Sequence, residues 1–123
     1  MKFGGTPLFI AAQKGHLGVV QALIDARADS NLACVDGATP LFIAAQKGHL
    51  GVVQALIDAR ADSNLATNDG ATPLFIAAQK GHLGVVQALI DARADSNLAT
   101  NEGATPLFIA AQEGHLGAVQ AFI

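Results

Sequence analysis

The strongest constraint on this chain is an internal repeat of 33 residues. The eight residues Thr-Pro-Leu-Phe-Ile-Ala-Ala-Gln occur four times, beginning at Thr6, Thr39, Thr72 and Thr105. Residues 6–33 recur unchanged at 39–66 and 72–99. A period of roughly 20–50 residues is typical of arrays in which each unit packs on its neighbours. We therefore treat residues 1–123 as one domain of four units, the last incomplete: 1–33, 34–66, 67–99 and 100–123.

Local signals within one unit predict two helices and a loop. In the second unit, Thr39 suits a helix N-cap and Pro40 suits the first helical position, where its missing N–H costs nothing. Gly48 is placed to end this helix in a left-handed cap. A second helix is expected over about 50–59, and residues 63–71 have turn chemistry. The expected fold class is an all-α solenoid of stacked helix–turn–helix units with projecting β-turn or hairpin loops.

The unit length and its opening residues resemble the ankyrin repeat, whose motif is Thr-Pro-Leu-His-x-Ala. The resemblance covers the whole chain. In the second unit it rests on Thr39-Pro40-Leu41, Ala44-Ala45, Gly48-His49-Leu50, Val52-Val53, Ala61-Asp62 and Asn64. It implies a non-enzymatic scaffold for protein–protein interaction, which binds a partner through its loop tips and the first-helix face of its concave side.

The chain departs from the family pattern in every unit. The family's His after Thr-Pro-Leu is replaced by Phe9, Phe42, Phe75 and Phe108. These rings are either core groups or an exposed stripe, and both alternatives stay open. The glycine that ends the family's second helix is replaced by Arg27, Arg60 and Arg93. An arginine that keeps the left-handed cap costs on the order of 1 kcal/mol. Near-identical units that depart from the family average indicate one repeat multiplied by recent duplication or by engineering.

The resemblance also implies which residues would contact a partner. In the loops they are Val35, Asp36, Ala38, Asn68, Asp69, Ala71, Asn101, Glu102 and Ala104. In the first helices they are Gln13, Lys14, Gln46, Lys47, Gln79, Lys80, Gln112 and Glu113. The few differences between units, among them Cys34, Val35, Glu102 and Glu113, fall largely on this surface. This favours adaptation to a target, although surface positions also drift most freely.

The repetition argues against metal binding and catalysis. Histidines recur once per unit, at His16, His49, His82 and His115. Stacking would hold their rings roughly 10 Å apart, too far to share a zinc ion, so we expect each to satisfy backbone carbonyls in the Gly-His turn. The aspartates around the second helices are expected to form surface ion pairs with the nearby arginines. Because an active site needs a unique constellation of groups, we expect no enzyme, metal or cofactor.

Composition restricts the partner and the compartment. Apolar residues make up 51% of the chain, which supplies ample material for a core. A net charge of −3 argues against nucleic acid or an anionic membrane as the main partner. The longest apolar stretch is far shorter than the ~20 residues of a membrane span, and residues 1–5 show no secretory leader. These features are compatible with a soluble cytoplasmic protein, in which the single Cys34 is expected to be an exposed thiol.

Three functional interpretations stay open. The chain is a protein-binding module, an engineered or idealised array with no natural ligand, or a structural element that stacks end to end with its own copies. Repeat arrays normally need polar caps, yet the last unit stops at Phe122 and Ile123 within its second helix. We therefore expect an exposed apolar face at that end, which favours some self-association.

Overall fold

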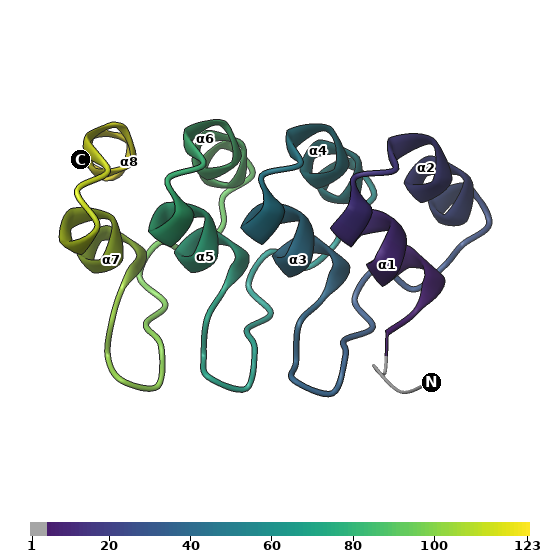
Figure 1. Ribbon diagram of the computed structural model, residues 1–123, viewed down its shortest axis with the longest axis horizontal. Helices are drawn as coiled ribbons and strands as arrows, with labels where there is room; N and C mark the ends of the chain where they lie inside the picture. Colours follow the sequence, from purple (N-terminus) through teal and green to yellow (C-terminus); the bar gives the residue numbers. More distant parts are fainter. Residues whose placement is uncertain (1–4) are drawn as a thin grey trace.

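The computed structural model describes residues 5–123. Residues 1–4, on which most of the prediction about a secretory leader rests, lie outside it. The described residues form eight α-helices, arranged as four units in a row (Figure 1). The first helices of the units are α1 (Pro7–Lys14), α3 (Pro40–Lys47), α5 (Pro73–Lys80) and α7 (Pro106–Gln112). The second helices are α2 (Leu17–Asp25), α4 (Leu50–Asp58), α6 (Leu83–Asp91) and α8 (Leu116–Phe122).

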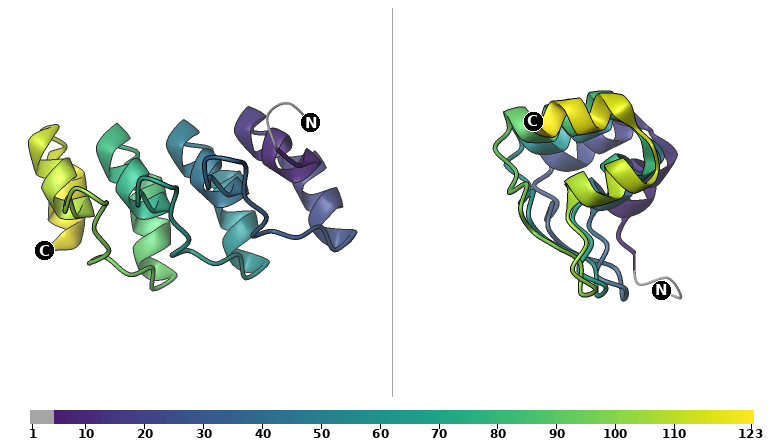
Figure 2. Two further views of the ribbon diagram at one scale, coloured as in Figure 1. Left: turned by 90° about the horizontal axis from the view of Figure 1, so that it is seen from below. Right: turned by 90° about the vertical axis from the view of Figure 1, so that its left-hand side faces the viewer.

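The helices form two layers, with the first helices in one and the second helices in the other (Figure 1). Loops between successive units project from the layer of first helices. Viewed along the array, the units nearly superimpose and the loops project on the same side (Figure 2). The predicted all-α array of stacked helix–turn–helix units is therefore confirmed.

The predicted helix ends are also confirmed. The Thr39 hydroxyl accepts a hydrogen bond from the Phe42 N–H at 3.1 Å, and the same cap begins each first helix. Gly48 ends α3 with φ 76°, in the left-handed region. Helix α4 ends at Asp58, within one residue of the expected end. Local sequence chemistry thus sets where each helix starts and stops.

The core runs through the whole array because each inner helix has neighbours on both sides. Helix α3 packs between α1 and α5, and residues 40–45 of it are all buried. The small side chains of Ala44 and Ala45 are fully buried, which allows neighbouring helices to approach closely. Leu41 and Leu56 fill the space between the two layers. Stacking therefore buries a helix that is apolar on nearly every side.

Histidine joins each unit to the one before it. The Nε2 atom of His49 lies 3.1 Å from the carbonyl oxygen of Gln13, and His82 makes the same contact with Gln46. The His49 imidazole also covers Gly15 of the preceding unit, because a Cβ at Gly15 would lie 2.9 Å from the ring. The expectation that these histidines satisfy backbone carbonyls is confirmed, and the carbonyl belongs to the preceding unit.

A second set of hydrogen bonds joins the loop tips. The Asn68 N–H donates to the Asp36 carbonyl oxygen at 2.9 Å, and the Asn68 side-chain amide donates to that of Val35 at 3.1 Å. Asn101 repeats both bonds with the loop before it. Successive loops are therefore held in register, so that a surface built on them keeps the period of the array.

The arginines do keep the left-handed backbone: φ is 66° at Arg27, 65° at Arg60 and 66° at Arg93. The aspartates that follow them have a role that we did not expect. Asp62 accepts a hydrogen bond from the Asn64 N–H at 2.9 Å, and Asp29 and Asp95 do the same in their units. These carboxylates therefore stabilise the turn after the second helix.

Replacing Arg60 by glycine should stabilise the protein. Its φ of 65° suits glycine, and its side chain is exposed, so Arg60→Gly should gain about 1 kcal/mol. That corresponds to a rise in Tm of roughly 4 °C. The control is Ala59→Gly, at φ −82°, which should destabilise by roughly 0.5–1 kcal/mol. Equal effects of the two variants on thermal unfolding would show that the left-handed backbone of Arg60 is not strained.

Loss of an inner histidine should be costlier than loss of the first one. His82→Ala removes a bond of 3.1 Å to Gln46 and should cost about 1–2 kcal/mol in chemical denaturation. His16 is exposed, and its side chain makes no capping bond, so His16→Ala should stay within about 0.5 kcal/mol of the parent. If both variants lost the same stability, the bond between units would not be the cause.

Candidate functional site

Two adjoining hollows lie where the loops face the first helices. The first has a volume of about 800 Å³ and the second about 890 Å³. The first is lined by Gly5, Phe9, Ile10, Gln13, Lys14, Cys34, Val35, Asp36, Ala38, Phe42, Ile43 and Gln46. The second is lined by Asp36, Phe42, Gln46, Thr67, Asp69, Ala71, Phe75, Ile76, Gln79, Thr100, Asn101, Glu102, Ala104, Phe108, Ile109 and Gln112. We call the two together the groove.

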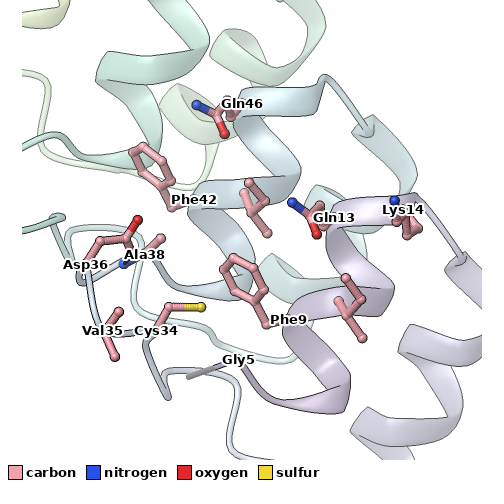
Figure 3. Close-up of a pocket in the computed structure, with 12 residues that line it drawn as sticks. Gly5, Phe9, Gln13, Lys14, Cys34, Val35, Asp36, Ala38, Phe42 and Gln46 are labelled. Carbon is pink, nitrogen blue, oxygen red and sulfur yellow. Dashed lines mark hydrogen bonds between the residues drawn. The ribbon is translucent and has the colours of Figure 1, made fainter. Parts of the chain in front are cut away.

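The groove changes chemistry along its length although the units are nearly identical. In the first hollow, Phe9, Cys34 and Phe42 line the space beneath the first-helix residues Gln13 and Gln46 (Figure 3). In the second hollow the loops contribute threonines and two further carboxylates, Asp69 and Glu102, besides Asp36, which lines both hollows; none of the described residues that line the second hollow is a lysine or arginine. One half of the groove is therefore mainly apolar and the other is acidic.

Most of the residues predicted to contact a partner lie in this groove. The structure brings together Gln13, Lys14, Val35, Asp36, Ala38, Gln46, Asp69, Ala71, Gln79, Asn101, Glu102, Ala104 and Gln112. The remaining four, Lys47, Asn68, Lys80 and Glu113, are exposed but do not line either hollow. Ala38 is buried, so it offers almost no surface to a partner.

The residues that line the groove but were not predicted to contact a partner are Gly5, Cys34, Thr67, Thr100, and the isoleucines and phenylalanines of the first helices. The isoleucines Ile10, Ile43, Ile76 and Ile109 precede the glutamines by three positions, and the phenylalanines precede them by four. Because residues three and four apart share one face of a helix, the spacing from Gln13 and its copies could have indicated them. The groove floor is thus aromatic and aliphatic, beneath an amide rim.

The phenylalanines are core groups in the middle of the array. Phe42 is 7% exposed and Phe75 is 8% exposed, whereas Phe108 is 57% exposed. The rings have the same sequence context, so the difference comes from the following unit, which covers Phe42 and Phe75. Of the two alternatives left open by the sequence, inner rings are core and the last ring is exposed.

Cys34 does not lie at an exposed tip, as we had expected; it is half-buried. Its sulfur points toward Phe9 within the first hollow (Figure 3). A Cβ at Gly5 would lie 3.5 Å from that sulfur. Burial, and secondarily the Asp36 carboxylate, raise the pKa of the Cys34 thiol. The thiol therefore stays protonated at neutral pH and acts as a small apolar group.

A family model for three copies of the ankyrin repeat matches residues 1–67 and 52–123. The chain belongs to the ankyrin-repeat family. Ankyrin repeats are in general protein–protein interaction modules and typically have no enzymatic activity. No curated protein matches the chain.

Within residues 5–123, no group of three or more His, Cys, Asp or Glu side chains is placed to hold a metal ion. None of the helices in those residues combines the length and the apolar character needed to cross a bilayer.

Truncation of an inner phenylalanine should unfold the array far more readily than truncation of the last one. Phe42→Ala removes a ring that is 7% exposed and should cost about 3–5 kcal/mol. Phe108→Ala removes a ring that is 57% exposed and should cost about 1 kcal/mol or less. Denaturant unfolding of the two variants measures both values, and a small loss for Phe42→Ala would place its ring outside the core.

Proposed function

We propose that this ankyrin domain binds an extended segment of another protein along the groove. The observation that carries this proposal is the change from an apolar half to an acidic half in an array of nearly identical units. Identical units would give the same surface along the whole groove, so the change in chemistry comes from loop residues that differ between units. They differ at Cys34 and Val35 on one side, whereas Glu102 on the other side keeps the carboxylate that its copies Asp36 and Asp69 carry.

The apolar half suits a hydrophobic side chain of the partner. Val35 is 80% exposed beside the hollow, and Cys34 and Ile43 line it. The third and fourth units have threonine and asparagine where this loop has Cys34 and Val35. An apolar anchor that enters this hollow would remove these surfaces from water, which is the main favourable contribution to binding there.

The acidic half suits basic side chains. Asp69 and Glu102 line it from successive loops, and within residues 5–123 the side chain of neither forms a hydrogen bond. In this loop a threonine hydroxyl accepts the hydrogen bond from the backbone: the Ala71 N–H donates to Thr67 at 3.2 Å. Both carboxylates are therefore available for lysine or arginine of a partner, which would add specificity and a faster association.

The repeat spacing sets the spacing expected in the ligand. Packed helices lie about 8–10 Å apart, and three residues of an extended chain span about 10 Å. Asp69 and Glu102 belong to adjacent units, so the basic residues of the ligand should lie three positions apart. The rim amides of Gln46 and Gln79 can both donate to and accept from the ligand backbone.

Selection from a displayed library of random 12-residue peptides tests this function. We expect enriched peptides with an apolar residue at one end and two basic residues three positions apart. The affinity of a selected synthetic peptide, measured by calorimetry, should fall about tenfold or more when Asp69→Asn and Glu102→Gln are combined.

The matched control combines Asp25→Asn and Asp91→Asn. It removes the same two charges at exposed positions outside the groove, and it should leave the peptide affinity unchanged. Equal losses in the two double variants would show a general charge effect. Peptides that bind all variants equally, or no enriched peptides at all, would contradict binding in the groove.

A further inference from the structure

The first and last units each expose a face that the inner units bury. On the first unit, Ile10 is 45% exposed and Val19 is 50% exposed, whereas Ile43 and Val52 are 6% and 2% exposed. We call this the front face. On the last unit, Leu107 and Phe108 are 37% and 57% exposed, whereas their copies in α5 are 0% and 8% exposed. We call this the end face.

The inner junctions show what covers such faces, because every one of them joins an end face to a front face. At the junction of the last two units, a Cβ at Gly81 would lie 2.7 Å from the imidazole of His115. A Cβ at Gly117 would lie 3.0 Å from the Leu83 side chain. The end face thus supplies a glycine recess and a leucine, and the front face supplies a histidine and a second glycine recess.

The two terminal faces carry the unmatched halves of this junction. On the end face, Gly114 has nothing within 4 Å of a Cβ position, and Leu116 is 68% exposed. On the front face, Gly18 likewise has nothing within 4 Å, and His16 is exposed. His16 therefore has the shape to cover Gly114, and Leu116 has the shape to cover Gly18.

We propose that the end face of one copy of this chain packs on the front face of a second copy and continues the solenoid head to tail. In this junction α7 of one copy packs on α1 of the next and α8 packs on α2, as α5 packs on α7 and α6 on α8 within the chain. The Nε2 atom of His16 meets the carbonyl oxygen of Gln112, as His115 meets Gln79 at 3.0 Å. The occupant is a second copy because the inner junctions already show that pairing.

The charge pattern favours this junction over the first two internal ones. One position of each unit reads Lys14, Lys47, Lys80 and then Glu113, all exposed. Within the chain the first two junctions place lysine beside lysine, and the third already places Lys80 beside Glu113. Head-to-tail packing places Glu113 beside Lys14 of the second copy, at about the 8–10 Å spacing of packed helices. Opposite charges at that distance attract modestly at low ionic strength.

The geometry sets the form of the assembly. The end face and the front face differ, so each added copy leaves one of each exposed. The units of one chain follow one another in a row without curving back on themselves (Figure 1). Association should therefore continue into linear oligomers. It uses Ile10, Lys14, Phe108 and Gln112, which also line the groove, but it does not use the proposed ligand contacts Asp69 and Glu102. Loss of peptide binding when these two carboxylates are replaced should therefore leave the association intact, so the two proposals can fail independently.

Sedimentation equilibrium of the 123-residue chain tests the proposal. The weight-average mass should rise steadily above the 12.5 kDa of one copy as the concentration increases from micromolar to millimolar. A mass that stays at 12.5 kDa over this range would overturn it.

Two variants that each block one face sharpen the test. Val19→Lys places a charge on the front face, and Phe108→Lys places one on the end face. Each variant alone should sediment as a single copy, because one half of every junction is blocked. An equimolar mixture should form a dimer and stop there, since only one productive junction remains. Association through two like faces would instead allow the variant that keeps this face to dimerise on its own.

Matched controls separate the junction from a general effect of lysine. Gln21→Lys and Gln120→Lys add the same charge at positions that are exposed in every unit, and these variants should assemble like the parent. Circular dichroism melting shows whether each variant is folded, and Ile10→Glu is a second front-face variant should Val19→Lys unfold. Persistence of the parent's association in folded Val19→Lys, Ile10→Glu or Phe108→Lys would overturn the proposed junction.

The charge contribution has a separate readout. Glu113→Lys restores a lysine beside Lys14 at the junction and should weaken association roughly fourfold at low salt, with little effect above about 0.5 M salt. Glu113→Gln should lie between the parent and Glu113→Lys. If neither variant changed the association constant at low salt, Glu113 and Lys14 would not be neighbours in the assembly.

Discussion

Packing of one unit on the next is the interaction on which the rest of the structure depends. No unit buries its own apolar faces, because its helices are apolar on more than one side. The side chain of Leu74 is fully buried, and its copy Leu107, with no unit after it, is 37% exposed. Equivalent residues of equivalent helices thus belong to the core or to the surface, depending on whether a neighbouring unit covers them. Stability is therefore a property of junctions more than of units.

Hydrogen bonds between units give these apolar junctions a fixed register. Apolar packing alone is non-directional and tolerates sliding. The contact of His49 with the Gln13 carbonyl oxygen fixes the helical layers, and the contact of Asn68 with the Asp36 carbonyl oxygen fixes the loops. With both ends of the unit held, loop residues of successive units fall into line. That alignment turns scattered loop substitutions into a groove with two chemically distinct halves.

Features that depend on a few adjacent residues could be predicted from the sequence. The Thr39 cap, the Gly48 cap and the period of the array are of this kind, and all are confirmed. Features that depend on the next unit could not. The burial of Phe42 needed the position of its neighbours, and the inward direction of Cys34 needed the fold of its loop. The groove positions carried over from the family resemblance located most of the rim but not its phenylalanine and isoleucine floor.

The groove and the junction have different consequences when copies join. Within one copy the groove runs from an apolar half near Cys34 to an acidic half near Glu102. Head-to-tail packing would place the acidic half of one copy beside the apolar half of the next. A ligand longer than one groove would then contact both copies and strengthen their junction, since binding that favours the assembled state shifts the equilibrium toward it. Loop residues would thereby select the ligand, and the end faces would set how far its binding site extends.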